Sequence, residues 1–195
     1  NTDVAVRKTA SACVCFMMLE YIDDLTLSPS RSRRSNFCPG SPQMNVTLLT
    51  TPFSTTDLAE FESLSRQIFG GDATDEWLAS LVWRLENMPD VTLFFAEQAG
   101  KRVGFKAGYA TAYDRYYSWL GGVSPSVRRQ GIARTLMQHQ HDWLVQSRFN
   151  QVECHVDQDN AAMNDANLKA GLIVVGSFLK DGKPYTIMQK ATPTD

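Results

Sequence analysis

The sequence lacks long apolar runs and lacks a marked excess of either charge. No stretch approaches the roughly 18 apolar residues that a membrane-spanning helix needs, so we expect no membrane partner. The formal net charge of −2 argues against a protein that binds nucleic acid through a general basic surface. With 195 residues, 43% hydrophobic and 21% charged, the composition predicts about one ordinary globular domain.

Cysteine is scarce and unevenly placed. Cys13, Cys15 and Cys38 lie near the start and only Cys154 lies in the rest, which is not the pattern of a disulfide framework. A reducing, cytoplasmic location is therefore expected. Cys13-x-Cys15 has no second pair at a useful spacing, so we expect no metal site.

Two common phosphate-binding patterns are also missing. The nucleotide loop G-x-x-x-x-G-K-[ST] is absent, because Gly182-Lys183 is followed by Pro184. The dinucleotide pattern G-x-G-x-x-G is absent as well. Nucleotide binding of either kind is excluded on this ground.

Residues 1–43 differ in composition from the rest of the chain. They combine a short apolar patch with the Ser/Arg-rich run SPSRSRRS, and we expect a disordered or non-native extension. A secretory signal is the alternative, since Arg7 and Lys8 precede the patch, but a small-residue cleavage site is missing. The predicted domain covers residues 44–195.

From residue 44 onward, hydrophobic periodicity predicts alternating elements. A helix through Leu58 and Ile68 is expected to be capped by Thr55, Thr56 or Asp57. The order β-α-α-β-β-β-α-β-α-β-β predicts an α/β (α+β) fold with a mixed sheet flanked by helices. Strands are expected at 46–50, 91–98, 102–113, 116–123, 151–157, 172–179 and 184–190, and further helices at 75–86, directly after Gly131 and at 161–169.

The stretch VSPSVRRQGIARTLM (123–137) carries the chemistry. Ile132, Leu136 and Leu144 share one helical stripe, so a helix begins just after Gly131. A helix N-terminus offers unpaired N–H donors, and glycine lets an anion approach them closely. With Arg128, Arg129 and Arg134 nearby, the stretch predicts a phosphate-binding turn.

Val123-x-Pro125-x-x-Arg128-x-x-Gly131-x-Ala133 resembles the acetyl-CoA motif R/Q-x-x-G-x-G/A of the GNAT superfamily of N-acetyltransferases. Asn160 followed by Lys169-x-Gly171 and the final hairpin also fit that family. The resemblance covers about residues 44–190 and implies a mostly antiparallel GNAT-like fold with acetyl-CoA as cosubstrate. It implies that the strand ending at Val123 splays from its neighbour to admit the pantetheine arm, and that an N–H near Val123 polarises the thioester carbonyl. The cofactor-binding residues it implies are Gly122, Val123, Arg128, Arg129, Gln130, Gly131, Ile132, Ala133, Arg134 and Asn160.

Acetylation of an amine requires a base. In QVECHVD (151–157), alternation places Val152, Cys154 and Val156 on one face and Glu153, His155 and Asp157 on the other. His155 is the candidate base, because an imidazole titrates near neutrality, with Glu153, Asp157 and Asp114 as reserves. A half-exposed histidine without a catalytic role is the alternative.

The resemblance is incomplete at the general acid. Many family members carry a tyrosine seven residues after the position of Asn160, and here that residue is Asn167. A thiol with a pKa near ~8.5 already leaves tolerably as a thiolate. Asn167 then either orients the sulfur or is an ordinary helix residue.

The acceptor site is less defined. Tyr113, Tyr116, Tyr117 and Trp119 either line it or belong to the core. The first two helices and their connection, with acidic Asp72, Asp75, Glu76 and Glu86, are expected to form one wall and to favour a cationic amine. On the long helix, His139 and Gln140 are predicted as buried polar groups, and His139 and His141 point to different sides.

The leading interpretation is therefore an acetyl-CoA-dependent N-acetyltransferase that acetylates a primary amine of a small molecule or peptide through a ternary complex. The alternative is a non-catalytic acyl-CoA-binding sensor or interaction module, which the missing tyrosine favours. A nucleic-acid-binding protein using SRSRR, Arg128 and Arg129 is disfavoured by the net charge. A homodimer is possible.

Overall fold

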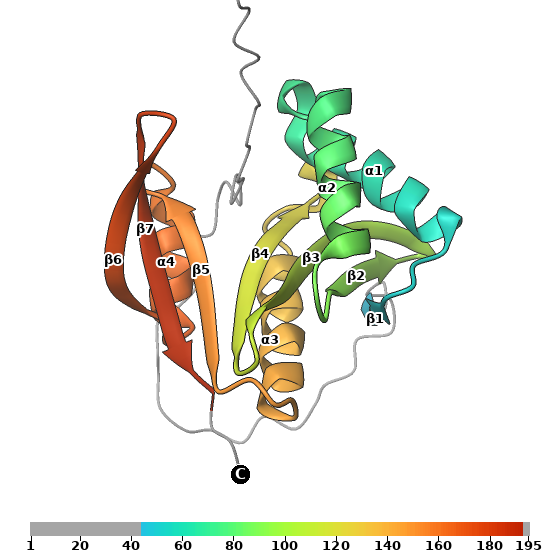
Figure 1. Cartoon of the computed structure of the whole chain (residues 1–195). Helices are drawn as coiled ribbons and strands as arrows, with labels where there is room; N and C mark the ends of the chain where they lie inside the picture. The colour runs from blue at the N-terminus through green and yellow to red at the C-terminus, as the bar shows by residue number, and fades with distance from the viewer. Residues whose placement is uncertain (1–43, 193–195) are drawn as a thin grey trace, which may run out of the picture.

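The computed structural model describes residues 44–192, which form one seven-stranded sheet with α-helices on both faces (Figure 1). The predictions for residues 1–43 lie outside the described residues. The α-helices are α1 (Thr55–Phe69), α2 (Asp75–Asn87), α3 (Ile132–Val145) and α4 (Ala161–Lys169). The strands are β1 (Met44–Thr50), β2 (Thr92–Gln98), β3 (Lys101–Ala112), β4 (Arg115–Val123), β5 (Gln151–Asp157), β6 (Ile173–Lys180) and β7 (Lys183–Ala191).

The strands lie in the order β1-β2-β3-β4-β5-β7-β6. Every neighbouring pair is antiparallel except β4 and β5, which run parallel because α3 connects them as a crossover. The predicted element order and the mixed, mostly antiparallel sheet flanked by helices are confirmed. The sequence predicted β5 and α4 to the residue and the other boundaries closely.

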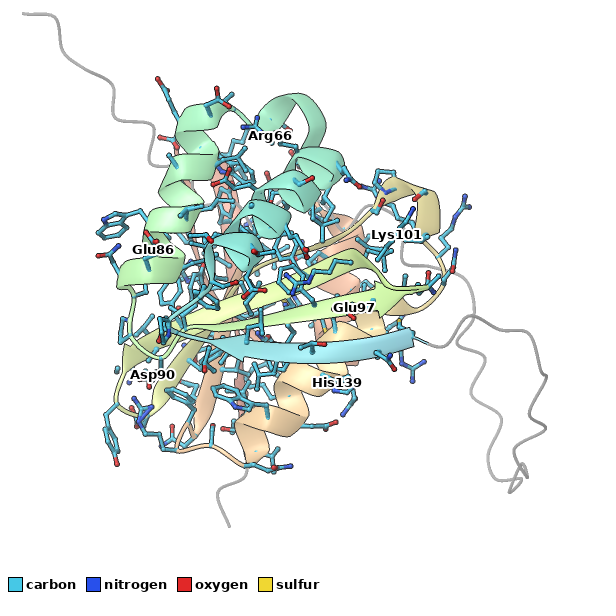
Figure 2. The ribbon with its side chains drawn as sticks, turned by 90° about the vertical axis from the view of Figure 1, so that its right-hand side faces the viewer. Arg66, Glu86, Asp90, Glu97, Lys101 and His139 are labelled. Carbon is cyan, nitrogen blue, oxygen red and sulfur yellow. The ribbon has the colours of Figure 1, made fainter. Side chains whose placement is uncertain are left out.

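The two faces of the sheet have separate cores. Phe61 and Leu81 of the α1–α2 pair pack with Phe95, Phe105 and Trp119 on one face. The core on the other face is formed by residues of α3, α4 and alternate positions of the strands. It includes Phe94, Ile132, Leu136, Cys154, Val156, Met163 and Met188. Figure 2 shows this layering from the β1 edge, with Arg66 and Glu86 on the side of the sheet opposite His139.

The helix caps explain where the first two helices begin. The hydroxyl of Ser54 accepts a hydrogen bond from the Asp57 amide, so Ser54 caps α1 rather than the predicted Thr55, Thr56 or Asp57. Thr74 caps α2 in the same way through the Trp77 amide. Within residues 44–192, none of the helices has the length and apolarity needed to cross a bilayer.

One half of the sheet has a bare face. The core beneath α1 and α2 contains residues of β2, β3 and β4 but none of β5, β6 or β7. Figure 1 shows the same arrangement, with α1 and α2 over the β2–β4 half and the β5–β7–β6 half uncovered on that side. A step therefore runs along the line where β4 meets β5.

Candidate functional site

The sheet opens between β4 and β5. These strands pair only at Arg115–Gln151, Tyr116–Val152 and Tyr117–Glu153, whereas β4 continues to Val123 and β5 to Asp157 without further mutual pairing. Figure 1 shows the two strands diverging from their paired ends. Beyond Tyr117, β4 pairs with β3 along one edge only, so its other edge faces the opening. Backbone N–H and C=O groups on such an edge can pair with an extended ligand.

The N-terminus of α3 lies directly after β4 and has no side-chain cap. Gly131 is the N-cap residue and is left-handed, with φ 77° and ψ 2°. In contrast, side chains of Ser54, Thr74 and Asn160 cap the other three α-helices of the described chain. The first intrahelical bond of α3 runs from the Thr135 amide to the Gly131 carbonyl. The amides of residues 132–134 precede it and have no helical acceptor, and we call this first turn with Gly131 the cradle.

Arg128 fastens the cradle to its surroundings. Its Nε donates to the Val123 carbonyl at 3.2 Å and one Nη donates to the Ile68 carbonyl at 3.4 Å, which ties the turn to β4 and to the end of α1. Arg128 therefore positions the turn through these two hydrogen bonds, in addition to contributing the positive charge that the sequence predicted. Arg129, Gln130 and Arg134 are exposed at the cradle.

Gly122 has a steric reason to lack a side chain. A Cβ on Gly122 would lie 2.5 Å from Cγ2 of Ile68, so α1 packs against the bare backbone of β4 at this point. The sequence predicted Gly122 as a backbone contact for a cofactor, and the fold requires glycine here in any case.

On the bare face of β5, Glu153 and His155 form a hydrogen-bonded pair. His155 Nε2 lies 2.8 Å from Glu153 Oε1, and both side chains are partly exposed. The other carboxylate oxygen of Glu153 accepts from Gln189 Nε2 at 2.6 Å. Gln189 in turn accepts from Gln151 Nε2 at 2.9 Å. This chain across β5 and β7 fixes the carboxylate and, through it, the imidazole.

Aromatic rings flank this pair. The His155 ring lies 4.8 Å from that of Tyr117 on β4 and 5.0 Å from that of Phe178 on β6, between centroids. Phe178 stacks on Tyr185 of β7 at 5.5 Å with an interplanar angle of 21°. We call Tyr117, His155, Phe178 and Tyr185 the aromatic row.

The four aromatic residues of the predicted acceptor wall separate in the structure. Tyr117 and Trp119 lie on the α1–α2 face, and Trp119 Nε1 has no hydrogen-bond partner among the described residues. Tyr116 lies on the opposite face, fully buried with Leu144 and hydrogen-bonded to Thr92, and burial raises the pKa of its phenol. That placement favours a core role for Tyr116. Tyr113 is 78% exposed, so it does not cluster with the other three.

Two asparagines of α4 are held by local bonds. Asn160 Oδ1 accepts from the Met163 amide and caps the helix. Asn167 is 4% exposed, and its amide nitrogen donates to Cys154 Sγ at 3.3 Å. Asn167 is thus a buried contact of β5 rather than a helix-surface residue.

The reserve candidates for the base, Asp157 and Asp114, each accept a local hydrogen bond. Asp157 is buried at the end of β5 and accepts from the Asp159 amide. Asp114 lies in the β3–β4 turn and accepts from Asn150 Nδ2.

The prediction for His139 is wrong, since this residue is exposed, whereas Gln140 is fully buried and accepts from the Ser118 hydroxyl at 2.8 Å. At 100° per residue, His139 lies about 60° from Leu136, on the side away from Gln140, which places it at the margin of the buried stripe. His141 is partly buried, and its desolvation, reinforced by the positive charges of Lys190 and Lys106, lowers its pKa to about 4.

The four acidic residues of the predicted acceptor wall also do not lie together. Asp75 is paired with Arg66 at 2.7 Å, while Asp72 and Glu76 are exposed in and after the α1–α2 connection. Glu86 lies at the other end of α2, beside Thr51 and Phe53. The described residues contain no group of three or more histidine, cysteine or carboxylate side chains placed to hold a metal ion.

Sequence reasoning missed Gln189 and Phe178. Alternation within their strands was visible, but nothing in the sequence showed that β7 lies between β5 and β6. Only that order brings the two residues beside Glu153 and His155.

The chain is similar to known acetyltransferases. A model of the acetyltransferase (GNAT) family matches residues 58–170, more than half of the chain. The ribosomal-protein-S18-alanine N-acetyltransferase from Escherichia coli is 20% identical with a TM-score of 0.65, over 77% of this chain and 96% of that one. Ard1 from Thermoplasma volcanium is also 20% identical (TM-score 0.59, 76% and 98%).

The spermidine/spermine N-acetyltransferase SpeG from Vibrio cholerae is 16% identical, with a TM-score of 0.59 over 77% of this chain and 95% of that one. At these identities the likeness shows the fold. None of the curated proteins matches the sequence.

Proposed function

Because the chain belongs to the GNAT family of acetyltransferases, we propose that it transfers the acetyl group of acetyl-CoA to a primary amine in a ternary complex. The observation that carries this proposal is the opening between β4 and β5. It places the uncapped N-terminus of α3 at the end of one strand and the Glu153–His155 pair on the other.

The cradle fits the diphosphate of the cosubstrate. Amides of the first turn of α3 and its positive dipole end attract an anion, and Gly131 presents no Cβ to obstruct it. The exposed side chains of Arg129 and Arg134 add positive charge, and Gln130 adds a polar group. The edge of β4 that β5 leaves unpaired, near Gly122 and Val123, would pair with the pantetheine arm.

The Glu153–His155 pair would manage the proton. An ionised carboxylate only accepts hydrogen bonds, so Nε2 of a neutral His155 carries the hydrogen toward Glu153 and leaves Nδ1 as an acceptor. The imidazole of His155 would take a proton that the acceptor amine loses, directly or through water. Gln189 is a positioning residue, because it holds the carboxylate that fixes the ring.

Acetyl-CoA, when bound, supplies an acetyl thioester. The ammonium form of the acceptor would first give one proton to solvent water; the neutral amine then forms the C–N bond as the C–S bond breaks, CoA leaves as a thiolate, and the second amine proton passes to His155. His155 holds the amine's proton at the end of the step. Asn167 holds α4 against β5 through its bond to Cys154. Asn160 caps the first turn of α4 through its bond to the Met163 amide.

The acceptor is proposed to be a cationic amine of a small molecule or a peptide. Exposed Asp72 in the α1–α2 connection, exposed Glu76 in the first turn of α2 and Glu153 in the opening support this charge preference. The names of the structural neighbours cover both kinds of acceptor, a ribosomal-protein alanine and the polyamines spermidine and spermine.

Release of free CoA thiol from acetyl-CoA in the presence of an amine panel tests this function. We expect amine-dependent release, slowed by His155→Ala while the acetyl-CoA dissociation constant stays unchanged. Binding of acetyl-CoA without turnover across a broad panel would instead identify a non-catalytic acyl-CoA sensor. Turnover in His155→Ala with an unaltered pH profile would remove this residue from the reaction.

A further inference from the structure

We propose that the acceptor is an arylalkylamine, a primary amine separated by a short alkyl chain from an aromatic ring that lies on the aromatic row. This inference rests on the proposed function and specifies its substrate class. The row crosses the opening, with Tyr117 on β4, His155 on β5, Phe178 on β6 and Tyr185 on β7.

The row lies where none of the helices formed by residues 44–192 covers its face of the sheet. The core beneath α1 and α2 ends at β4, so Phe178 and His155 are only partly covered. Their neighbours Tyr117 and Tyr185 are 4% and 8% exposed, which fixes the row from both sides. A partly exposed apolar surface beside polar groups is typical of a ligand-binding site.

The contacts of the row give it a defined geometry. The Phe178 and Tyr185 rings are nearly parallel, whereas His155 meets Phe178 at 67°. Phe178 therefore meets the imidazole in a T-shaped contact and stacks on Tyr185, so its ring is held at a fixed angle to both neighbours. A planar ligand ring gains offset-stacked and edge-to-face contacts from such a surface, which a saturated ring of equal size lacks.

The charge beside the aromatic row also suits an arylalkylamine. Glu153 supplies a carboxylate within 2.8 Å of His155, next to the row, where it attracts the ammonium group of an incoming amine. The π faces of the row favour the same cation. The ring of the ligand would then lie toward Phe178, while its amine lies at His155 in the opening.

The test compares 2-phenylethylamine with 2-cyclohexylethylamine and spermidine. The first two differ in planarity and not in length, and spermidine represents aliphatic polyamines. We expect kcat/KM for 2-phenylethylamine to exceed that of each other amine by about tenfold. Phe178→Leu, which keeps an apolar side chain without a ring, is expected to remove this preference through KM for the amine and to leave KM for acetyl-CoA unchanged.

Leu179→Ala is the matched control, because Leu179 follows Phe178 on the same strand and is 75% exposed. This variant should keep the preference. Equal kcat/KM for the phenyl and cyclohexyl amines, or a higher value for spermidine, overturns the inference even if Phe178→Leu folds poorly. A failure of the proposed function looks different, since acetyl-CoA would bind while none of the amines released CoA.

Discussion

Replacing Gly131 by glutamate probes the cradle where its backbone is most demanding. Gly131 has φ 77°, and a side chain in this left-handed region costs about 1–2 kcal/mol. A Cβ there would meet nothing within 4 Å, so no clash adds to that cost. Gly131→Ala should therefore lower the melting temperature by a few degrees and weaken acetyl-CoA binding only modestly.

Glutamate adds a charge to the same strain. A carboxylate about 5.5 Å from one phosphate charge is repelled by about 3 kcal/mol at an effective dielectric constant of about 20. Solvent screening at this exposed position reduces the repulsion to about 2 kcal/mol, or roughly thirtyfold in affinity. We expect Gly131→Glu to bind acetyl-CoA about thirtyfold more weakly than Gly131→Ala, as measured by titration calorimetry.

Gly182→Glu provides the control. Gly182, in the β6–β7 turn, has φ 79° and also open space at its Cβ position, so it carries the same backbone strain and the same added charge away from α3. It should lose similar stability and keep the wild-type affinity for acetyl-CoA. Equal affinities for Gly131→Glu and Gly182→Glu would refute the placement of the diphosphate on α3.

Three other outcomes are expected. Gly122→Ala should destabilise the fold by about 1–3 kcal/mol, because its Cβ would overlap Ile68, and a denaturant titration should show a smaller cost of Gly122→Ala in an Ile68→Ala background than in the wild type. The folded pKa of His141, about 4, lies below its ordinary 6.5, so the unfolded chain binds more protons between these values. The free energy of unfolding should accordingly fall by up to about 3 kcal/mol as the pH drops from 6.5 to 4, and His141→Gln should flatten this dependence; an identical slope would contradict the assignment. Gln189→Leu should shift the pH profile of kcat without changing the affinity for acetyl-CoA, whereas an unchanged profile in this variant would count against a positioning role.

Much of the site could be predicted because its parts are local in the sequence. The alternation in QVECHVD placed Glu153 and His155 on one face of β5, and the structure has them there. The small residues and the amphipathic stripe located the start of α3 at Ile132. In both cases the periodicity of one element decides which way its side chains point.

The sequence predicted less well which residues of different elements lie next to one another. Tyr116 and Tyr117 were grouped as one wall, yet successive strand residues point to opposite faces, and only Tyr117 faces His155. His139 was predicted to be buried because it lies next to the apolar stripe of the long helix. The sequence does not show where that stripe ends, since the rotation of a helix about its axis depends on which residues pack on the sheet. Its exposure was decided by the contacts of Leu136 and Gln140.

The sequence by itself determined the order of elements, the family, and the turn that leads into α3, because each follows from residue types at fixed short spacings. The family resemblance implied that the strand ending at Val123 splays from its neighbour, but only the tertiary structure shows that β4 and β5 part after three paired positions and that β7 lies between β5 and β6. Those two facts create the opening and bring Gln189 and Phe178 to Glu153 and His155. They depend on pairing between segments far apart in the chain, which local periodicity does not encode.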